Sequence, residues 1–137
     1  MSVLAGAMPA VPSSFLGFDF GTKRIGVASG NTLTRSAQAL QTVAAEGDAR
    51  FEAIGRLIRE WQPNALVVGV PFHPDGAAHD NTERARRFAR QLHGRFKLTV
   101  HEVDERYTTT EAQAAGACDI DAESAAIILE QFLRNLR

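Results

Sequence analysis

The sequence has one cysteine, no zinc-ligand motif and no long hydrophobic segment, and each absence argues against a class of protein. A lone Cys118 cannot form an internal disulfide, which suits a reducing compartment such as the cytoplasm. The four histidines show no HxxxH spacing and there is no CxxC, which argues against a zinc site. Residues 1–14 lack a basic start and a long apolar core. We therefore expect a flexible tail there, and neither a signal peptide nor a membrane span.

The composition is that of an ordinary globular domain, and only the distribution of charge is unusual. The 137 residues, 45% of them hydrophobic and 23% charged, suffice for a single domain, which we place at 15–137. The net charge of −1 does not by itself indicate a nucleic-acid partner. However, residues 81–97 hold six basic residues against one acidic residue, and residues 102–130 hold eight acidic residues against one basic residue. This indicates either a phosphate-binding surface beside a cation site or two ordinary solvated faces.

Hydrophobic periodicity predicts alternating strands and helices. Apolar segments predict strands at 15–20, 25–30, 34–43, 65–70 and 97–103. Helical spacing predicts a helix over Phe51, Ile54, Leu57, Ile58 and Trp61, which Pro63 ends. Capping-box patterns at Asp80-x-x-Glu83 and Thr108-x-x-Glu111 predict two more helices, and Asp121 stands at the expected N-cap of a last one. Because a helix precedes 65–70, this strand should run parallel to the first, giving a mixed sheet of the α/β class.

Asp19 stands inside the apolar strand of the stretch "SSFLGFDFGTKRIGVASG", where a carboxylate is costly unless something pairs with it. Lys23 or Arg24 is near enough in the chain to be that partner, although so short a turn favours outward orientation. A D-x-G-T hairpin also opens the phosphate-binding site of actin-like and sugar-kinase ATPases. Those proteins need two lobes, whereas this chain has the length of about one lobe and has no second D-x-G loop.

Three further carboxylates lie where they can meet Asp19. Asp104 and Glu105 follow the strand 97–103, and Asp121 opens the last helix. Carboxylates that meet at one sheet edge repel each other unless a cation binds between them. Their oxygens suit Mg²⁺ or Mn²⁺, and a pair of such ions can promote phosphodiester hydrolysis. Taken singly, Asp121 can equally be an N-cap, and Asp104 and Glu105 can be surface charges.

Together these motifs resemble the YqgF/RuvX family, which is associated with pre-16S rRNA cleavage and Holliday junction resolution. The segments that carry the resemblance are "FDFGTKRIGVASG" (18–30), "VVGVPFHPDG" (67–76), "RARRFARQL" (84–92), "DERYTTTEA" (104–112) and "DAESAAIILEQFL" (121–133). The resemblance spans residues 15–136. It implies an RNase H-like fold, a mixed five-stranded sheet with helices on both faces, and nuclease chemistry that depends on Mg²⁺ or Mn²⁺.

The resemblance also implies roles for particular residues. Asp19, Glu105 and Asp121 match the catalytic metal ligands, and Asp104 is a second candidate for the third ligand. Contacts with nucleic acid are implied at Thr22, Lys23, Arg24, Arg84, Arg87 and Arg106. Many family members have a longer, Lys-rich loop at the position of segment 112–120. In this chain the segment is short and has no basic residue. Binding of nucleic acid would therefore depend more on the helix 84–97 and on Lys23 and Arg24.

The function that we expect is metal-dependent hydrolysis of a structured RNA, near the 5′ end of pre-16S rRNA, in the bacterial cytoplasm. One alternative is resolution of branched DNA by a homodimer, because a four-way junction has to be cut at two sites. The other is a nucleic-acid-binding ribosome-assembly factor without catalytic activity. We expect no association with membranes under any of these interpretations.

Overall fold

The structure is a computed structural model that describes residues 13–71, 81–104 and 120–136. Five strands and three helices follow one another as β1 (Ser14–Asp19), β2 (Ile25–Asn31), β3 (Ala37–Val43), α1 (Gly47–Trp61), β4 (Ala65–Val70), α2 (Thr82–Phe96), β5 (Thr99–Asp104) and α4 (Ile120–Arg134). All five strands expected from the sequence are confirmed. Most of the expected tail and the helix expected after Thr108 lie outside the described residues.

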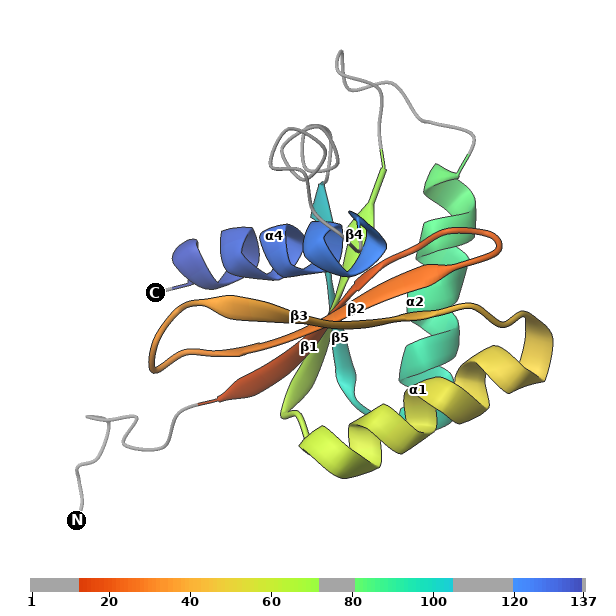
Figure 1. Cartoon of the computed structure of the whole chain (residues 1–137), viewed down its shortest axis with the longest axis horizontal. Helices are drawn as coiled ribbons and strands as arrows, with labels where there is room; N and C mark the ends of the chain where they lie inside the picture. Colours follow the sequence, from red (N-terminus) through yellow and green to blue (C-terminus); the bar gives the residue numbers. More distant parts are fainter. Residues whose placement is uncertain (1–12, 72–80, 105–119, 137) are drawn as a thin grey trace.

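The strands form one mixed sheet in the order β3-β2-β1-β4-β5 (Figure 1). β2 is antiparallel to β1 and to β3, while β4 is parallel to β1 and to β5. The parallel pairing of β1 with β4 was expected from the helix between them and is confirmed. Because β1, β4 and β5 run in one direction, their carboxyl ends lie at the same edge of the sheet.

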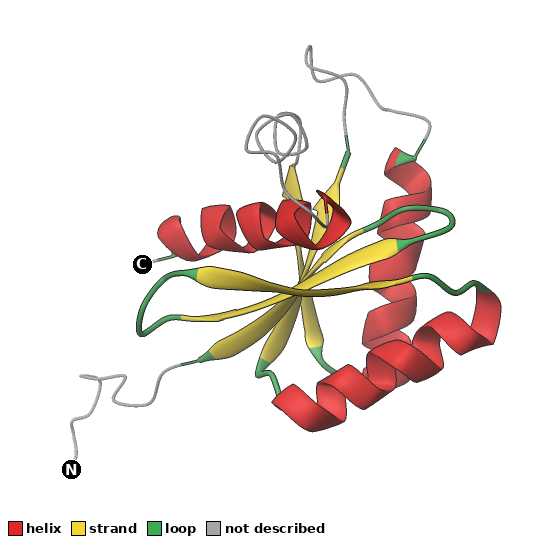
Figure 2. Cartoon of the chain, viewed as in Figure 1, coloured by secondary structure: helices red, strands yellow, loops and turns green. Residues whose placement is uncertain are grey.

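Helices cover both faces of this sheet (Figure 2). On one face, Leu16, Phe18 and neighbouring apolar residues form a core with α1 and α2. On the other face, Phe15 and Val67 form a second core with α4. The expected α/β architecture with helices on both faces is therefore confirmed, and strand alternation assigns each residue of β1 to one core or the other. Among the described residues, no helix is long and apolar enough to cross a membrane.

Glycines in β1 and β2 allow α4 to approach the sheet closely. A Cβ atom on Gly17 would stand 2.9 Å from the Cβ atom of Leu129, and one on Gly30 would stand 3.0 Å from a methyl carbon of Leu133. Neither glycine has a positive φ. Their role is thus close approach, one of the two explanations that the sequence suggested.

Two helices begin differently from the sequence prediction. The capping box led by Asp80 is wrong, because the N-cap of α2 is Asn81 and its side chain makes no capping hydrogen bond. Instead, the Thr82 hydroxyl donates to the Pro71 carbonyl and so ties α2 to the end of β4. α4 begins at Ile120, which puts Asp121 inside the first turn rather than at the N-cap.

The helical pattern of α1 also predicts a buried Trp61, and this prediction is wrong. Phe51, Ile54 and Leu57 are buried as expected, but Trp61 is 39% exposed. Trp61 is the last residue of the helix and lies beside Ser14 and Pro63, where the chain turns from α1 into β4. The final turn of α1 therefore projects past the core that its earlier turns cover.

Candidate active site

The carboxyl ends of the parallel strands hold the first predicted site residue. Asp19 is the last residue of β1 and is half-buried. Its register partners are Gly26 on β2 and Gly69 on β4. Residues paired in this way point to the same face of a sheet, so neither neighbouring strand places a side chain beside the Asp19 carboxylate. This face is the one that α4 covers, because Phe15 and Gly17 of the same strand contact that helix.

The first turn of α4 brings Asp121 to the same place. A Cβ atom on Gly26 would stand 1.8 Å from the carbonyl oxygen of Asp121, so the helix backbone rests directly on this glycine. Gly26 is also the register partner of Asp19. Antiparallel partners have Cα atoms about 4.5–5.5 Å apart. Asp19 and Asp121, although far apart in sequence, thus flank Gly26 on one face of the sheet.

Arg24 forms an ion pair with Asp121. Its Nε lies 3.2 Å from Oδ2 of Asp121, with side chains 66% and 30% exposed respectively. The sequence left open whether Arg24 contacts nucleic acid or serves as the partner of Asp19. In the structure, the guanidinium neutralises the other carboxylate of the pair. Thr22 and Lys23, in the same turn, are exposed.

The turn that carries Arg24 is held by a residue that the sequence prediction missed. Arg50 of α1 is only 8% exposed. It donates from Nη2 to the carbonyl oxygens of Gly21 at 3.2 Å and Thr22 at 2.6 Å, and from Nε to Ala45 at 3.1 Å. Burial lowers the pKa of Arg50, and the nearby charge of Glu46 opposes this shift.

A signal for Arg50 was nevertheless present in the sequence. Arg50 precedes Ile54 and Leu57 by four and seven positions, which places it on the apolar stripe of α1. An arginine on a buried stripe needs partners for its five donors. Here the carbonyl oxygens of Gly21, Thr22 and Ala45 accept three hydrogen bonds from it. The ring of Phe20 lies beside it as well, with its centroid 5.7 Å from Cζ of Arg50.

Asp104 ends β5 at the same edge of the sheet but points to the other face. Val103 pairs with Gly69, which pairs with Asp19, so Val103 shares the face of Asp19. By alternation, Asp104 points toward the side of α1 and α2. Glu102 does the same, and its carboxylate lies 3.5 Å from Nε of Arg86 on α2.

Glu105, the third predicted carboxylate, and Arg106 lie outside the described residues. Within the described ranges, no group of three or more Asp, Glu, His or Cys side chains could hold a metal ion. The described part of the site thus contains two carboxylates on one face, Asp19 and Asp121. It also contains a fixed turn and one arginine that is paired with Asp121.

The basic helix α2 proves to be largely neutralised. Arg86, Arg90 and Arg95 pair with Glu102, Glu83 and Asp48 respectively. The hydrogen bond from Arg90 lowers the pKa of Glu83. Arg84 and Arg87 are exposed and form no ion pair among the described residues; Arg84 donates to Oδ1 of Asn81. These two arginines are therefore the ones available to an anionic ligand.

The sequence is similar to a family with a known description and to proteins of several bacteria. A model of the RuvX family, described as Holliday junction resolvase, matches residues 13–135. A protein of Albidiferax ferrireducens named "Putative pre-16S rRNA nuclease" is 70% identical over 123 residues, which cover 90% of this chain and 79% of that protein. A protein of Polaromonas sp. with the same name is 68% identical, with coverage of 90% and 89%.

Solved structures support the fold. The structure of Thermus thermophilus RuvC in complex with a Holliday junction substrate aligns with a TM-score of 0.50 at 14% identity, covering 85% of this chain and 92% of that chain. Another structure of Thermus thermophilus RuvC gives the same TM-score and identity, with coverage of 88% and 93%. At this identity the likeness concerns the fold alone, and it confirms the RNase H-like fold that was expected from the sequence.

Proposed function

The chain belongs to the RuvX family, and from this premise we propose that it is a nuclease that cleaves pre-16S rRNA near its 5′ end. The observation that carries the proposal is that Asp121 rests on Gly26, which is the register partner of Asp19. A second support is that relatives 68–70% identical are named as pre-16S rRNA nucleases. Because bacterial ribosomal precursors are made in the cytoplasm, we place the reaction there.

The two carboxylates fit a divalent cation. Asp19 and Asp121 supply oxygen ligands, which Mg²⁺ and Mn²⁺ prefer. Gly26 admits the first turn of α4, which carries Asp121, and Gly69 places no side chain beside Asp19 from β4. A bound Mg²⁺ or Mn²⁺ would activate water for attack on phosphorus and stabilise the leaving oxygen.

For the third ligand we propose Glu105 rather than Asp104. Asp104 belongs to the face that α1 and α2 cover, opposite to Asp19. Because side chains alternate along a strand, the position after Asp104 is the one that belongs to the face of Asp19.

The remaining site residues would bind and orient the RNA. Thr22 and Lys23 stand exposed on a turn whose carbonyl groups Arg50 holds. A turn fixed in this way can present a hydroxyl and an ammonium group to a phosphate without first being ordered. We propose that Arg84 and Arg87 contact the backbone further from the cleaved bond, and that Arg106 contacts the phosphate near it.

Cleavage assays with a matched pair of variants test this function. A 5′ fragment of pre-16S rRNA is digested by the wild type, by Asp19→Asn and by Asp48→Asn in the presence of Mn²⁺ or Mg²⁺. We expect Asp19→Asn to lose at least about a hundredfold in rate, since positioned charges provide most of the stabilisation of the transition state. Asp48, which is 88% exposed on α1, should tolerate the same change. Undiminished cleavage by Asp19→Asn would refute the assignment.

Junction resolution is the second candidate, because the family model that matches is described as Holliday junction resolvase. That reaction needs two active sites, so it requires a homodimer. A four-way DNA junction digested beside the RNA distinguishes the two functions, and cleavage of the junction alone would favour the second. Binding of RNA without cleavage of either substrate would instead indicate a non-catalytic assembly factor.

A further inference from the structure

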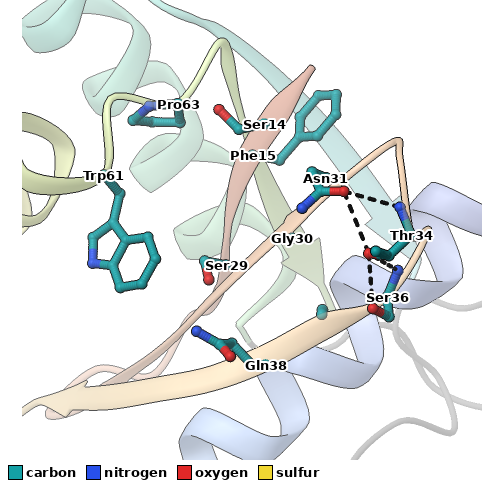
Figure 3. Close-up of a pocket in the computed structure, with 11 residues that line it drawn as sticks. Ser14, Phe15, Ser29, Gly30, Asn31, Thr34, Ser36, Gln38, Trp61 and Pro63 are labelled. Carbon is teal, nitrogen blue, oxygen red and sulfur yellow. Dashed lines mark hydrogen bonds between the residues drawn. The ribbon is translucent and has the colours of Figure 1, made fainter. Parts of the chain in front are cut away.

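A recess of about 300 Å³ lies at the opposite end of β1 from Asp19 (Figure 3). Ser14, Ser29 and Gln38 line it from three adjacent strands, and Trp61 lines it from the end of α1. Among the described residues that line it, none carries a charge. An uncharged recess with an aromatic wall suits a neutral, partly apolar ligand better than a phosphate or a carboxylate.

Several polar groups of this recess are left without partners. The Ser29 hydroxyl, the Gln38 amide and the Trp61 indole N–H make no hydrogen bond to any described residue. By contrast, the side chains of Asn31 and Thr34 at the rim are hydrogen-bonded to each other. In Figure 3, Trp61, Ser29 and Gln38 lie around the same opening. The recess thus offers donors and acceptors near an indole ring.

We propose that this recess binds one unpaired nucleobase of the RNA substrate. The base would stack on Trp61 and form hydrogen bonds through its edge with Gln38 and Ser29. Planar heterocycles with a polar edge are the ligands that combine both interactions, and stacking on aromatic side chains is common in the recognition of single-stranded RNA. The choice of an RNA base over other heterocycles rests on the proposed nuclease function.

The position of the recess relative to Asp19 determines how far the bound base lies from the cleaved bond. Ser14 and Asp19 are the two ends of β1, and five residues of strand span about 17 Å. Ser29 pairs with Leu16, so the base-binding side chains lie on the face of α1 and α2, opposite to Asp19. The RNA would therefore have to pass around the sheet between the bound base and the cleaved bond, which lie several nucleotides apart. Arg35, between the lining residues Thr34 and Ser36, donates from Nη1 to the Leu136 carbonyl at 3.1 Å, so its guanidinium lies toward α4 and away from the base that we place here. An unpaired base held there would select where along the RNA the carboxylates act.

The single tryptophan makes the test specific, since Trp61 is the only one in the chain. The full-length protein is titrated, without divalent ions, with a single-stranded oligoadenylate and with an abasic oligomer of equal length. We expect saturable quenching of the Trp61 fluorescence by the oligoadenylate alone. Gln38→Ala should weaken this binding by about fivefold, the usual effect of one lost hydrogen bond. Ser29→Ala is the second variant, in case Gln38→Ala fails to fold by circular dichroism.

Leu33→Ser is the matched control, because Leu33 is exposed on the same hairpin but does not line the recess. It should leave the titration unchanged. Equal quenching by the abasic oligomer, absence of saturable quenching, or unaltered affinity in both lining variants would overturn the proposal. This readout does not depend on catalysis. Base binding without RNA cleavage would therefore refute only the nuclease function, and cleavage without base binding would refute only the recess.

Discussion

Gly26 of β2 lies in direct contact with Asp121 of α4, so close that a Cβ atom on the glycine would stand 1.8 Å from the aspartate carbonyl oxygen. The contact places the first turn of α4 over the strand that pairs with Asp19. α4, which carries Asp121, is therefore positioned by β2. β2 is the neighbour of β1, the strand that carries Asp19. The geometry of the site thus depends on a residue that has no side chain.

Replacing Gly26 with alanine should therefore damage both stability and activity. The added methyl group must push the first turn of α4 away, which we expect to cost about 1–3 kcal/mol of unfolding free energy. A displacement of about 1 Å at Asp121 should lower the cleavage rate roughly a hundredfold. Urea denaturation and single-turnover cleavage measure the two effects.

Gly94→Ala is the control for this substitution. Gly94 lies in α2, and a Cβ atom there would meet nothing within 4 Å. In an exposed helical position, alanine should raise the stability by about 0.5–1 kcal/mol and leave cleavage unchanged. If Gly26→Ala behaves like Gly94→Ala, the close packing between β2 and α4 is not what positions Asp121.

Arg50→Met tests the connection between α1 and the turn after β1. The substitution leaves the carbonyl oxygens of Gly21 and Thr22 without their donor, and we expect a loss of about 2 kcal/mol in unfolding free energy. Amide hydrogen exchange at residues 20–24 should accelerate, because the turn loses its attachment.

Arg50→Lys should recover only part of this stability, since a lysine keeps the charge but not the forked donors. Arg56→Met removes an exposed arginine from the same helix and should change the stability by less than about 0.5 kcal/mol. Unaltered exchange in the turn of Arg50→Met would mean that these hydrogen bonds do not hold it.

The fold was predictable because its signals are local. Five apolar strand segments and the helical spacing of α1, α2 and α4 can each be recognised within a few turns of chain. Asp19 could be singled out for the same reason, since a carboxylate in an apolar strand is conspicuous. The close approach at Gly17 and Gly30 also follows from glycines in a strand.

Contacts between distant segments were not predictable in this way. Arg50 holds a turn 28 positions earlier, and Arg24 pairs with Asp121 only because α4 packs on Gly26. The exposure of Trp61 depends on where α1 ends relative to the sheet. The choice between Asp104 and Glu105 depends on the register of β5 against β4, which the sequence does not encode locally.

Arg24→Ala should shift metal and RNA affinity in opposite directions. The guanidinium of Arg24 is paired with the carboxylate of Asp121, which we propose as a metal ligand. An exposed pair is weak, so we expect Mn²⁺ to bind about two- to fivefold more tightly without it. Binding of RNA should weaken and become less sensitive to salt, because one cation is lost. Isothermal titration with Mn²⁺ and RNA binding at several salt concentrations measure both.

Lys23→Ala distinguishes the effect of losing the Arg24–Asp121 ion pair from the effect of losing one positive charge. Lys23 is exposed on the same turn and has no acidic partner among the described residues. Its removal should weaken RNA binding as Arg24→Ala does, but it should leave the affinity for Mn²⁺ nearly unchanged. A similar gain in Mn²⁺ affinity for both variants would contradict competition between Arg24 and the ion for Asp121.

Asp104→Asn and Glu105→Gln distinguish the two candidates for the third carboxylate. Asp104 points to the face of α1 and α2, so it would not be a metal ligand. Its neutralisation should lower the cleavage rate by less than about tenfold, because it changes only the electrostatic potential at the site. Glu105→Gln should lower the rate by at least about a hundredfold and also weaken Mn²⁺ binding in titrations without RNA. The reverse order would show that β5 presents Asp104 to the site, so that its register near the carboxyl end must change when the ion binds. Since both variants remove one negative charge from adjacent positions, a difference between them reports the direction of the side chain and not the net charge.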